Sequence, residues 1–433
     1  MKQTLERYFE FEKLGTNWRT EILAGLTTFV TMAYIIFVNP SILKDAGMPV
    51  AATTAATCLS AALGSFLMGA VARYPIALAP GMGLNAYFTY AVVKGMGVPW
   101  EVALGAVFLS GAAFLLLTLT GVRQMIVEAI PSDLYAAVAA GIGFFIALIG
   151  LRNAGLIVAS PATLVELGKL SSPTALLAIV GLFVTAGLMV WNVRGAMLWG
   201  VAITTAVALV TGQTAWTSTA SPLAALGETA LKLDIGRALS LGAVEIIFVF
   251  LFVDMFDNVG TLVAVGKRAG LFDAANRIPR VDRILLADAT ATMGGSLLGT
   301  STVVSYIESA AGVAAGGRSG VTAIVVALLF VLALFLVPVA GVIPAGATAP
   351  ALILVGCLMM KHTAEIAWND LEVAIPAFLT IALIPLTFSI ANGLAAGFLS
   401  YVLLKSIRGK RVHWFVYLLA GLFLLRFVYL ARG

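Results

Sequence analysis

The stretch IIFVFLFVDMFDNVGTLVAVG at 246–266 is long and apolar enough to cross a bilayer, yet it carries Asp254 and Asp257 near its centre. A carboxylate at membrane depth costs roughly a few kcal/mol, so it usually faces a cavity that uses it. Because they are three residues apart, the two acids project from nearly the same face of a helix. This stretch therefore predicts a polar pocket inside a membrane protein.

A second apolar stretch, TSTVVSYIESAAGVAAG at 300–316, contains Glu308 and has more Gly, Ser and Thr than an ordinary lipid-facing helix. Across all 433 residues, 61% are hydrophobic and 11% are charged, whereas charged residues approach a quarter of a soluble domain. The chain is thus predicted to be an all-α polytopic membrane protein. Its net charge of +5 forms no basic helix or stripe, so nucleic-acid binding is not expected.

The residue types that bind metals or form disulfides are scarce. Cys58 and Cys357 both lie in apolar segments, and His362 and His413 lie beside Lys or Arg at span ends. We therefore expect no disulfide framework, no metal site and no cofactor. The charged segment at 1–21 has no short apolar core with a cleavage site, so no signal peptide is predicted.

Fourteen segments are predicted to span the membrane, of which three are atypical: 76–93 and 300–316 are interrupted by small residues and Pro, and 283–298 is short. The others lie at 22–42, 50–72, 100–120, 132–151, 174–191, 195–212, 241–266, 321–342, 344–361, 371–389 and 391–407. A last apolar stretch, 414–430, is either an extra span or a helix in the interface. With a cytoplasmic N-terminus, 18 of the 26 Lys and Arg residues lie inside and six outside, which favours that orientation.

The two halves of the chain echo each other. GSFLMG at 64–69 recurs as GSLLG at 295–299, each just before an interrupted segment, and the Ile-Pro pair at 130–131 recurs at 343–344. Each unit would contain seven spans. Because seven is odd, the second copy enters the membrane from the opposite side, which makes the repeat inverted.

The interrupted segments occupy corresponding places in the two halves. Such broken apolar segments are the best sequence pointer to a transporter's binding site, because non-helical backbone survives at membrane depth only where protein or water covers it. Pro80 and Gly81 would end a short extended stretch in span 3, and 300–304 would be its counterpart in span 10. Asn85 and Glu308 then lie in the first turns of the two half-helices.

Each buried polar residue has a functional and a structural interpretation. For Asp257 and Glu308 we favour the functional interpretation, ligand binding or proton carriage, because no Lys or Arg falls inside either span. Asp254 either serves directly or bonds to a neighbouring helix, and Asp288 is expected to bridge helices. Asn85 suits recognition of an amide-like edge as well as helix capping.

Other residues are better explained by packing than by chemistry. Thr28, Thr31 and Tyr34 in the first span are expected to pack helices, whereas Tyr306 either stacks on a planar ligand or packs. The glycine stretches lack the Lys-Ser/Thr of a P-loop, and the chain has no His-Glu-x-x-His and no Gly-x-Gly-Asp before its paired aspartates. An enzyme is therefore not expected.

Long motifs resemble a known family. The chain is similar to the AzgA-like purine permeases of the nucleobase transporter superfamily, collinearly over residues 6–431. The motifs are GLTTFVTMAYIIFVNP at 25–40, ARYPIALAPGMGLNAYF at 72–88, FVDMFDNVGTLVAVG at 252–266, LLADATATMGGSLLGTSTVVSYIESAAGVAAGGRSG at 285–320 and IPAFLTIALIPLTFSIANG at 375–393.

The resemblance implies two inverted seven-span repeats that form a core domain and a gate domain. The core would comprise 22–121 and 241–342, and the gate 122–212 and 343–407. The remaining segments are a cytoplasmic N-terminal segment at 1–21, an extracellular loop at 213–240, and a basic linker with a C-terminal helix at 408–433. Dimers occur in the superfamily, so a homodimer is compatible with the resemblance.

The resemblance also implies uptake of adenine, guanine or hypoxanthine across the plasma membrane, driven by the proton gradient. The family's substrate-binding positions fall on Asn85, Gly83, Asp257 and Glu308, and by a weaker transfer on Thr261 and Tyr306. Asp254, Asp257 and Glu308 are the candidates for carrying the coupled proton. Other members have Asp-Thr where this chain has Asp257-Asn258, which would bear on selectivity.

An alternative from another class is an anion exchanger or channel on the same inverted-repeat fold. Such a protein should place basic or neutral residues at the facing half-helices, where this chain places acids. A receptor or scaffold would not need buried acids at a broken helix.

Overall fold

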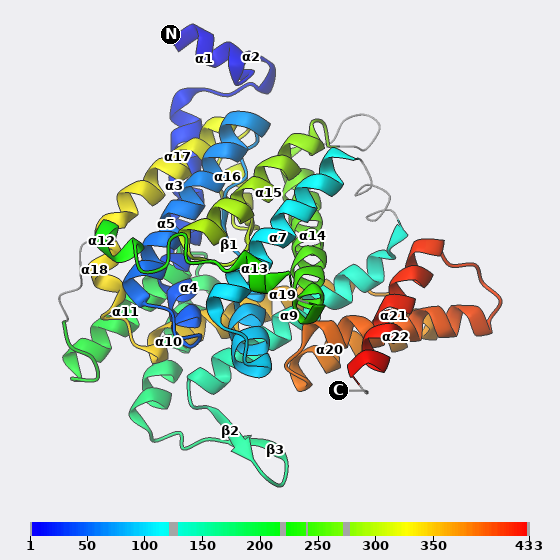
Figure 1. Ribbon diagram of the computed structural model, residues 1–433. Coiled ribbons are helices and arrows are strands. Elements are labelled where there is room, and N and C mark those ends of the chain that lie inside the picture. Colours follow the sequence, from blue (N-terminus) through cyan, green and yellow to red (C-terminus); the bar gives the residue numbers. More distant parts are fainter. Residues whose placement is uncertain (1, 121–128, 217–221, 240, 272–277, 431–433) are drawn as a thin grey trace. The chain divides into compact units, whose positions relative to one another are not determined.

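The computed structural model describes residues 2–120, 129–216, 222–239, 241–271 and 278–430 (Figure 1). Eight helical segments of these residues are long and apolar enough to cross a membrane, which makes the chain an integral membrane protein; the count of fourteen spans stays a prediction. The eight are Trp18–Lys44, Val50–Ala72, Trp100–Leu119, Ser132–Asn153, Pro173–Val190, Gly320–Ala340, Ala345–Glu365 and Ile390–Ile407. Arg123 and Arg277, which entered the orientation count, lie outside the described residues.

The chain divides into two compact units. One consists of Met1–Leu119 and Gly150–Ala351, and the other of Thr120–Ile149 and Leu352–Gly433. The predicted division into core and gate domains stays a prediction.

The first unit contains two short two-stranded sheets among its helices. In chain order its elements are α1 Lys2–Tyr8, α2 Phe11–Leu14, α3 Trp18–Met32, α4 Ile35–Lys44, α5 Val50–Leu67, the π-helix η1 Met68–Ala72, β1 Leu78–Pro80, α6 Met82–Ala86, the π-helix η2 Tyr87–Gly95, α7 Trp100–Leu119, β2 Ile157–Ser160, β3 Leu164–Leu167, α10 Pro173–Val190, α11 Ala196–Val210, α12 Pro222–Leu226, α13 Ile235–Ala238, α14 Leu241–Ala269, α15 Val281–Leu298, β4 Val303–Ser305, α16 Ser309–Ala314, α17 Gly320–Leu332, the 3-10 helix η3 Ala333–Leu336 and α18 Val337–Ala340.

The second unit is helical in its described part. Its elements are the larger part of α9 Ser132–Asn153, the C-terminal half of α19 Ala345–Met359, the 3-10 helix η4 Met360–Glu365, α20 Leu371–Leu386, α21 Ile390–Ile407 and α22 Trp414–Leu430.

Helices from both halves of the sequence interleave in the first unit. α5 packs against both α15 and α17, α7 packs against α14 and α15, and α3 packs against α17 (Figure 1). Glycine permits a close approach of α17 to η1 as well: a Cβ added at Gly320 would overlap the carbonyl oxygen of Gly69 in η1. The two halves therefore share one interior.

Strands β1 and β4 pair in this interior. They run antiparallel, with Leu78 opposite Ser305 and Pro80 opposite Val303. All six of their residues are buried. The isolated pair leaves backbone groups that neighbouring helices must satisfy, because an unpaired buried amide costs free energy.

One hydroxyl on each flanking helix satisfies such groups. Ser65 Oγ of α5 accepts from the Leu78 N–H and donates to the Leu78 carbonyl, both at 3.0 Å. Thr292 Oγ1 of α15 makes the same two bonds with Val303, at 3.2 Å and 3.0 Å. The two broken segments are thus held by equivalent side-chain clamps, one from each half.

A buried carboxylate joins α3 to the start of α17. Glu21 is fully buried and accepts hydrogen bonds from the Arg318 and Ser319 N–H groups at 3.0 Å and 3.2 Å. The Thr322 hydroxyl also donates to it, at 2.5 Å. Because the first N–H groups of a helix have no partners inside it, this acid stabilises the N-terminus of α17.

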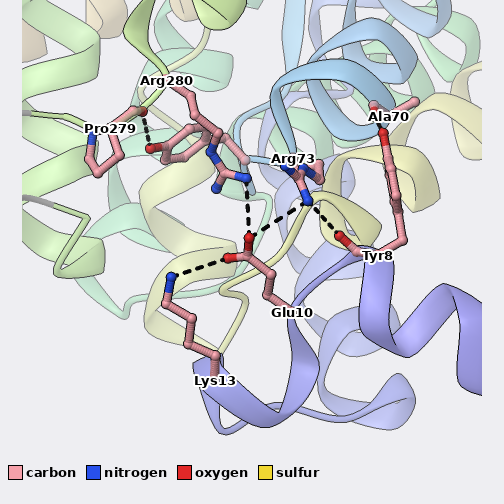
Figure 2. Close-up of polar contacts among 8 residues, drawn as sticks. Tyr8, Glu10, Lys13, Ala70, Arg73, Pro279 and Arg280 are labelled. Atoms are coloured by element: carbon pink, nitrogen blue, oxygen red, sulfur yellow. Dashed lines mark hydrogen bonds and ion pairs between the residues drawn. The ribbon is translucent and has the colours of Figure 1, made fainter.

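Charges attach the N-terminal segment to the rest of the first unit, as Figure 2 shows. Glu10 lies 3.6 Å from a guanidinium nitrogen of Arg73 and equally far from one of Arg280. Arg73 also donates to the Tyr8 carbonyl at 2.9 Å, and the Tyr74 hydroxyl donates to the Pro279 carbonyl at 2.5 Å. One acid therefore bridges the end of η1 to the residue that precedes α15.

In the second unit α20 and α21 form a closely packed helical hairpin. Glu372 at the start of α20 binds Lys405, Arg408 and Lys410 at 2.9, 2.5 and 3.0 Å. Phe398 of α21 stacks on Phe423 of α22 with ring centroids 5.9 Å apart. The C-terminal helix is thus packed on α21, and an extra span or an interfacial helix at 414–430 stays a prediction.

Candidate functional site

Two broken helices meet at the β1–β4 pair. β1 is followed directly by Gly81, the N-cap of α6, and β4 is followed by a short turn that leads to Glu308, the N-cap of α16. The pairing continues beyond the strands, because the Gly81 N–H donates to Thr302 at 3.0 Å and the Tyr306 N–H donates to Ala77 at 2.9 Å. The starts of two half-helices are therefore fixed beside each other.

Glu308 is held by a tyrosine from the first span. The Tyr34 hydroxyl donates to Glu308 Oε1 at 2.6 Å, across 274 residues of sequence. Tyr34 is fully buried at the break between α3 and α4. Glu308 forms no ion pair with any residue that the structure describes. A carboxylate without a cation, in an apolar surrounding, is available to accept hydrogen bonds from a ligand.

Asp257 and Glu308 both lie near enough to Tyr306 for their charges to act on its hydroxyl. Tyr306 is buried and donates to the Pro80 carbonyl at 2.6 Å, which joins the two broken segments. Asp257 lies on α14 and is partly buried. The structure thus brings together Asp257, Tyr306 and Glu308 from the predicted set and adds Tyr34, which the sequence interpretation treated as packing.

Asn85 is buried and bonded within the protein. Its Nδ2 donates to Asn39 Oδ1 at 2.5 Å, and its Oδ1 accepts from the Ser301 hydroxyl. Asn39 donates in turn to Thr57 at 2.7 Å and to Thr300 at 2.9 Å. In this conformation the Asn85 amide therefore serves a network between the two halves. Gly83 is partly buried and Thr261 is buried, one helical turn beyond Asp257 on α14; in the described part of the chain no side-chain hydrogen bond or ion pair ties either one to the acids.

A second network surrounds Asn258. Its Nδ2 donates to Asp254 Oδ1 at 3.1 Å and to Asp288 Oδ2 at 2.5 Å, and its Oδ1 accepts from the Ser305 N–H at 3.2 Å. Asp254, Asn258 and Asp288 are all buried. Asp288 thus connects α15 to α14, and the network reaches β4 at Ser305, three residues before Glu308.

The sequence interpretation missed Asn39, although a signal for it exists. FVN at 37–39 and FDN at 256–258 match, and both asparagines bond to the following long helix, Asn39 to Thr57 of α5 and Asn258 to Asp288 of α15. When the two motifs are aligned, the neutral residue Val38 takes the position of the acid Asp257. Comparison of the two halves residue by residue would have revealed both asparagines.

Buried acids at broken helices inside a bundle of membrane spans are typical of secondary transporters. The sequence comparison agrees, since the model described as the Permease family, Xan_ur_permease, matches residues 19–395. The chain belongs to this permease family, which indicates a transporter rather than an enzyme.

Relatives match over nearly the whole chain. A permease of Methanocaldococcus jannaschii is 54% identical over 99% of both chains. The guanine/hypoxanthine permease PbuG of Bacillus subtilis is 46% identical, over 98% of this chain and 100% of its own length. The adenine permease AdeP of Escherichia coli is 44% identical, over 98% and 96%. The resemblance to purine permeases drawn from the motifs is thereby confirmed.

Solved structures share the fold at low identity. The transmembrane domain of the cyanobacterial bicarbonate transporter BicA superposes with a TM-score of 0.68 at 15% identity, over 88% of this chain and 97% of that one. The murine anion transporter Slc26a9 gives a TM-score of 0.62 at 12% identity, over 90% and 69%. At this identity the likeness concerns the fold alone.

Proposed function

We propose that the protein is a secondary active transporter that imports purine nucleobases, guanine or hypoxanthine and/or adenine, together with protons. The observation that carries the proposal is Glu308 at the start of a half-helix, with Asp257 and Tyr306 nearby, in a chain 44–46% identical to permeases named for these purines. Nothing comparable supports an enzymatic role.

The chemistry of the substrate fits these acids. A purine such as guanine presents a ring N–H next to an exocyclic NH2, and a carboxylate accepts such a pair through two nearly parallel hydrogen bonds. Away from water these bonds are stronger. In the proposal Glu308 and Asp257 accept the ring N–H groups, and the exocyclic NH2 group where the purine has one. Tyr306 lies against the purine, and Gly83, Asn85 and Thr261 line the same site.

Coupling to protons follows from the same acids. Burial disfavours an ionised carboxylate, so Asp254, Asp257 or Glu308 would take up a proton on the outside and release it inside. Alternating access would arise if the core, as assigned from the sequence, moved as a body against the gate. Fourteen spans in two inverted repeats and a cytoplasmic N-terminus belong to this proposal.

The site assignment is tested by uptake of labelled hypoxanthine into cells that lack their own purine permeases. Glu308→Ala and Asp257→Ala should each abolish uptake while the protein remains inserted and monodisperse in detergent. Matched controls are Glu365→Ala and Asp282→Ala, two exposed acids away from the site that should leave uptake intact. Near-normal transport in both site variants would remove the assignment.

The coupling ion is tested separately in proteoliposomes. At fixed sodium, a protonophore should collapse purine accumulation. Accumulation that persists and follows an imposed sodium gradient would reverse the assignment to protons.

The fold alone also fits an anion transporter, because the similar structures are anion transporters. The acids at the site argue against this alternative, since they repel anions. Thermal-shift measurements on purified protein with purines, uracil, ascorbate and sulfate discriminate the two: stabilisation by sulfate and by no purine would favour the anion transporter.

A further inference from the structure

Among the described residues, the Tyr34 hydroxyl has a single hydrogen-bond partner. Tyr34 is fully buried between α3 and α4, and its hydroxyl donates to Glu308 Oε1 at 2.6 Å. A buried phenol hydroxyl without a partner is costly, so this bond is expected to persist. Hydrogen bonds to ionised groups are also roughly twice as strong as neutral ones.

This bond determines what Glu308 can offer a ligand. A hydroxyl that donates to the carboxylate cannot donate elsewhere, and a carboxylate only accepts while it is ionised. The inference therefore assigns the coupled proton to Asp254 or Asp257, so that Glu308 stays ionised. Tyr34 and Glu308 together therefore present acceptors and no donor. The arrangement also fixes the direction of the carboxylate, because Glu308 is anchored at the N-cap of α16 and its Oε1 is anchored to the first span.

The purines differ in this respect. Guanine and hypoxanthine carry a hydrogen on N1, whereas N1 of adenine has none and accepts hydrogen bonds instead. A site of acceptors matches an N1–H and leaves N1 of adenine facing a carboxylate oxygen. Such a mismatch is discriminating, because it leaves polar groups unpaired in a desolvated site.

We propose that Tyr34 is a positioning residue that holds Glu308 as an oriented acceptor and thereby makes the site prefer 6-oxopurines, guanine and hypoxanthine, over adenine. The inference rests on the proposed purine transport and specifies its substrate class. Tyr34 acts through Glu308 and need not touch the purine itself.

The first test is Tyr34→Phe, which removes one oxygen atom. We expect the KM for hypoxanthine to rise about tenfold, as for the loss of one charge-assisted bond, with Vmax within about twofold. The inhibition constant of adenine should change by less than about threefold, so the preference for 6-oxopurines narrows. A general structural defect would instead weaken both purines or lower Vmax.

Tyr90→Phe is the matched control. Tyr90 is also buried, and its hydroxyl donates to Asp45 at 2.7 Å and accepts from Asn153 at 3.2 Å, neither of which belongs to the site. The same chemical change should leave the KM for hypoxanthine and the adenine inhibition constant unaltered.

A second variant tests the same preference by another route. Glu308→Gln replaces one acceptor oxygen by an NH2 donor, so binding of adenine relative to guanine should rise in thermal-shift titrations of purified protein. Adding Tyr34→Phe to Glu308→Gln should change the ratio of adenine binding to guanine binding by less than about twofold. The hydrogen bond between Tyr34 and the carboxylate of Glu308 is already altered in the single variant.

The outcomes separate the two proposals. If the wild-type protein neither binds nor transports any purine, the proposed function fails, and this inference fails with it. If the wild type prefers adenine, or if Tyr34→Phe behaves like Tyr90→Phe, purine transport stands and the role of Tyr34 is refuted.

Discussion

Asn39 and Thr300 are hydrogen-bonded at 2.9 Å although 261 residues separate them in the sequence. The bond joins α4 of the first half to the residues that lead into β4 of the second. Both side chains are fully buried, as are their further partners Thr57 and Asn85. Through Asn39, the network therefore holds Thr300, which precedes β4, beside Asn85 of α6, the half-helix that follows β1.

Asn39→Ala should destabilise the protein strongly. The change leaves buried polar groups of Asn85, Thr57 and Thr300 without their partner, and each unsatisfied group costs about 1–3 kcal/mol. We expect a lower unfolding temperature by differential scanning fluorimetry in detergent. Gln213→Ala, which shortens an exposed amide, is the control and should leave the temperature unchanged. Equal stability of the two variants would contradict the role of the network.

The clamps on the two strands should be equivalent in effect. Ser65→Ala and Thr292→Val each leave one strand amide unpaired, at Leu78 and Val303 respectively, at a cost of about 1–3 kcal/mol. Because the strands position Pro80 and Tyr306, we also expect a higher KM for hypoxanthine in both. Thr290→Val is the control for the second change, since its exposed hydroxyl bonds only to its own helix. A defect in one strand clamp alone would show that the halves are not equivalent here.

The sequence predicts the membrane class, the two interrupted segments and the acids Asp257 and Glu308, because each departs from what lipid tolerates. Tyr34 is not predictable in this way, and Asn39 is predictable only from the match of FVN at 37–39 with FDN at 256–258. One polar residue in an apolar helix has no periodic signal, and its meaning depends on a partner more than 250 residues away. The same limit applies to Glu21, whose spacing suggests a first-turn acid of α3 while its partners belong to the start of α17.

Gly320→Ala should prevent normal packing of α17. The added methyl group would overlap the carbonyl oxygen of Gly69, and because that atom belongs to the backbone, the two segments must separate. Overpacking of this kind costs about 1–3 kcal/mol or more. Gly187→Ala is a matched control, because a Cβ at Gly187 meets no atom within 4 Å. Size-exclusion chromatography should show loss of the monodisperse peak for Gly320→Ala only.

Glu10→Ala should loosen the N-terminal segment in a salt-dependent manner. Removal of the acid leaves Arg73 and Arg280 near each other without the charge between them (Figure 2). Ion pairs of this length in a partly exposed site contribute about 1 kcal/mol, so a modest fall in unfolding temperature is expected at low salt.

Salt should remove most of that difference, because added ions screen the attraction in the wild type and the repulsion in the variant. Lys13→Ala provides the control: Lys13 also lies 3.6 Å from Glu10, but its side chain is 78% exposed, so its loss should matter little at either salt concentration. If Glu10→Ala lowered the unfolding temperature equally at low and high salt, the contribution of Glu10 would be packing of its side chain and not its charge.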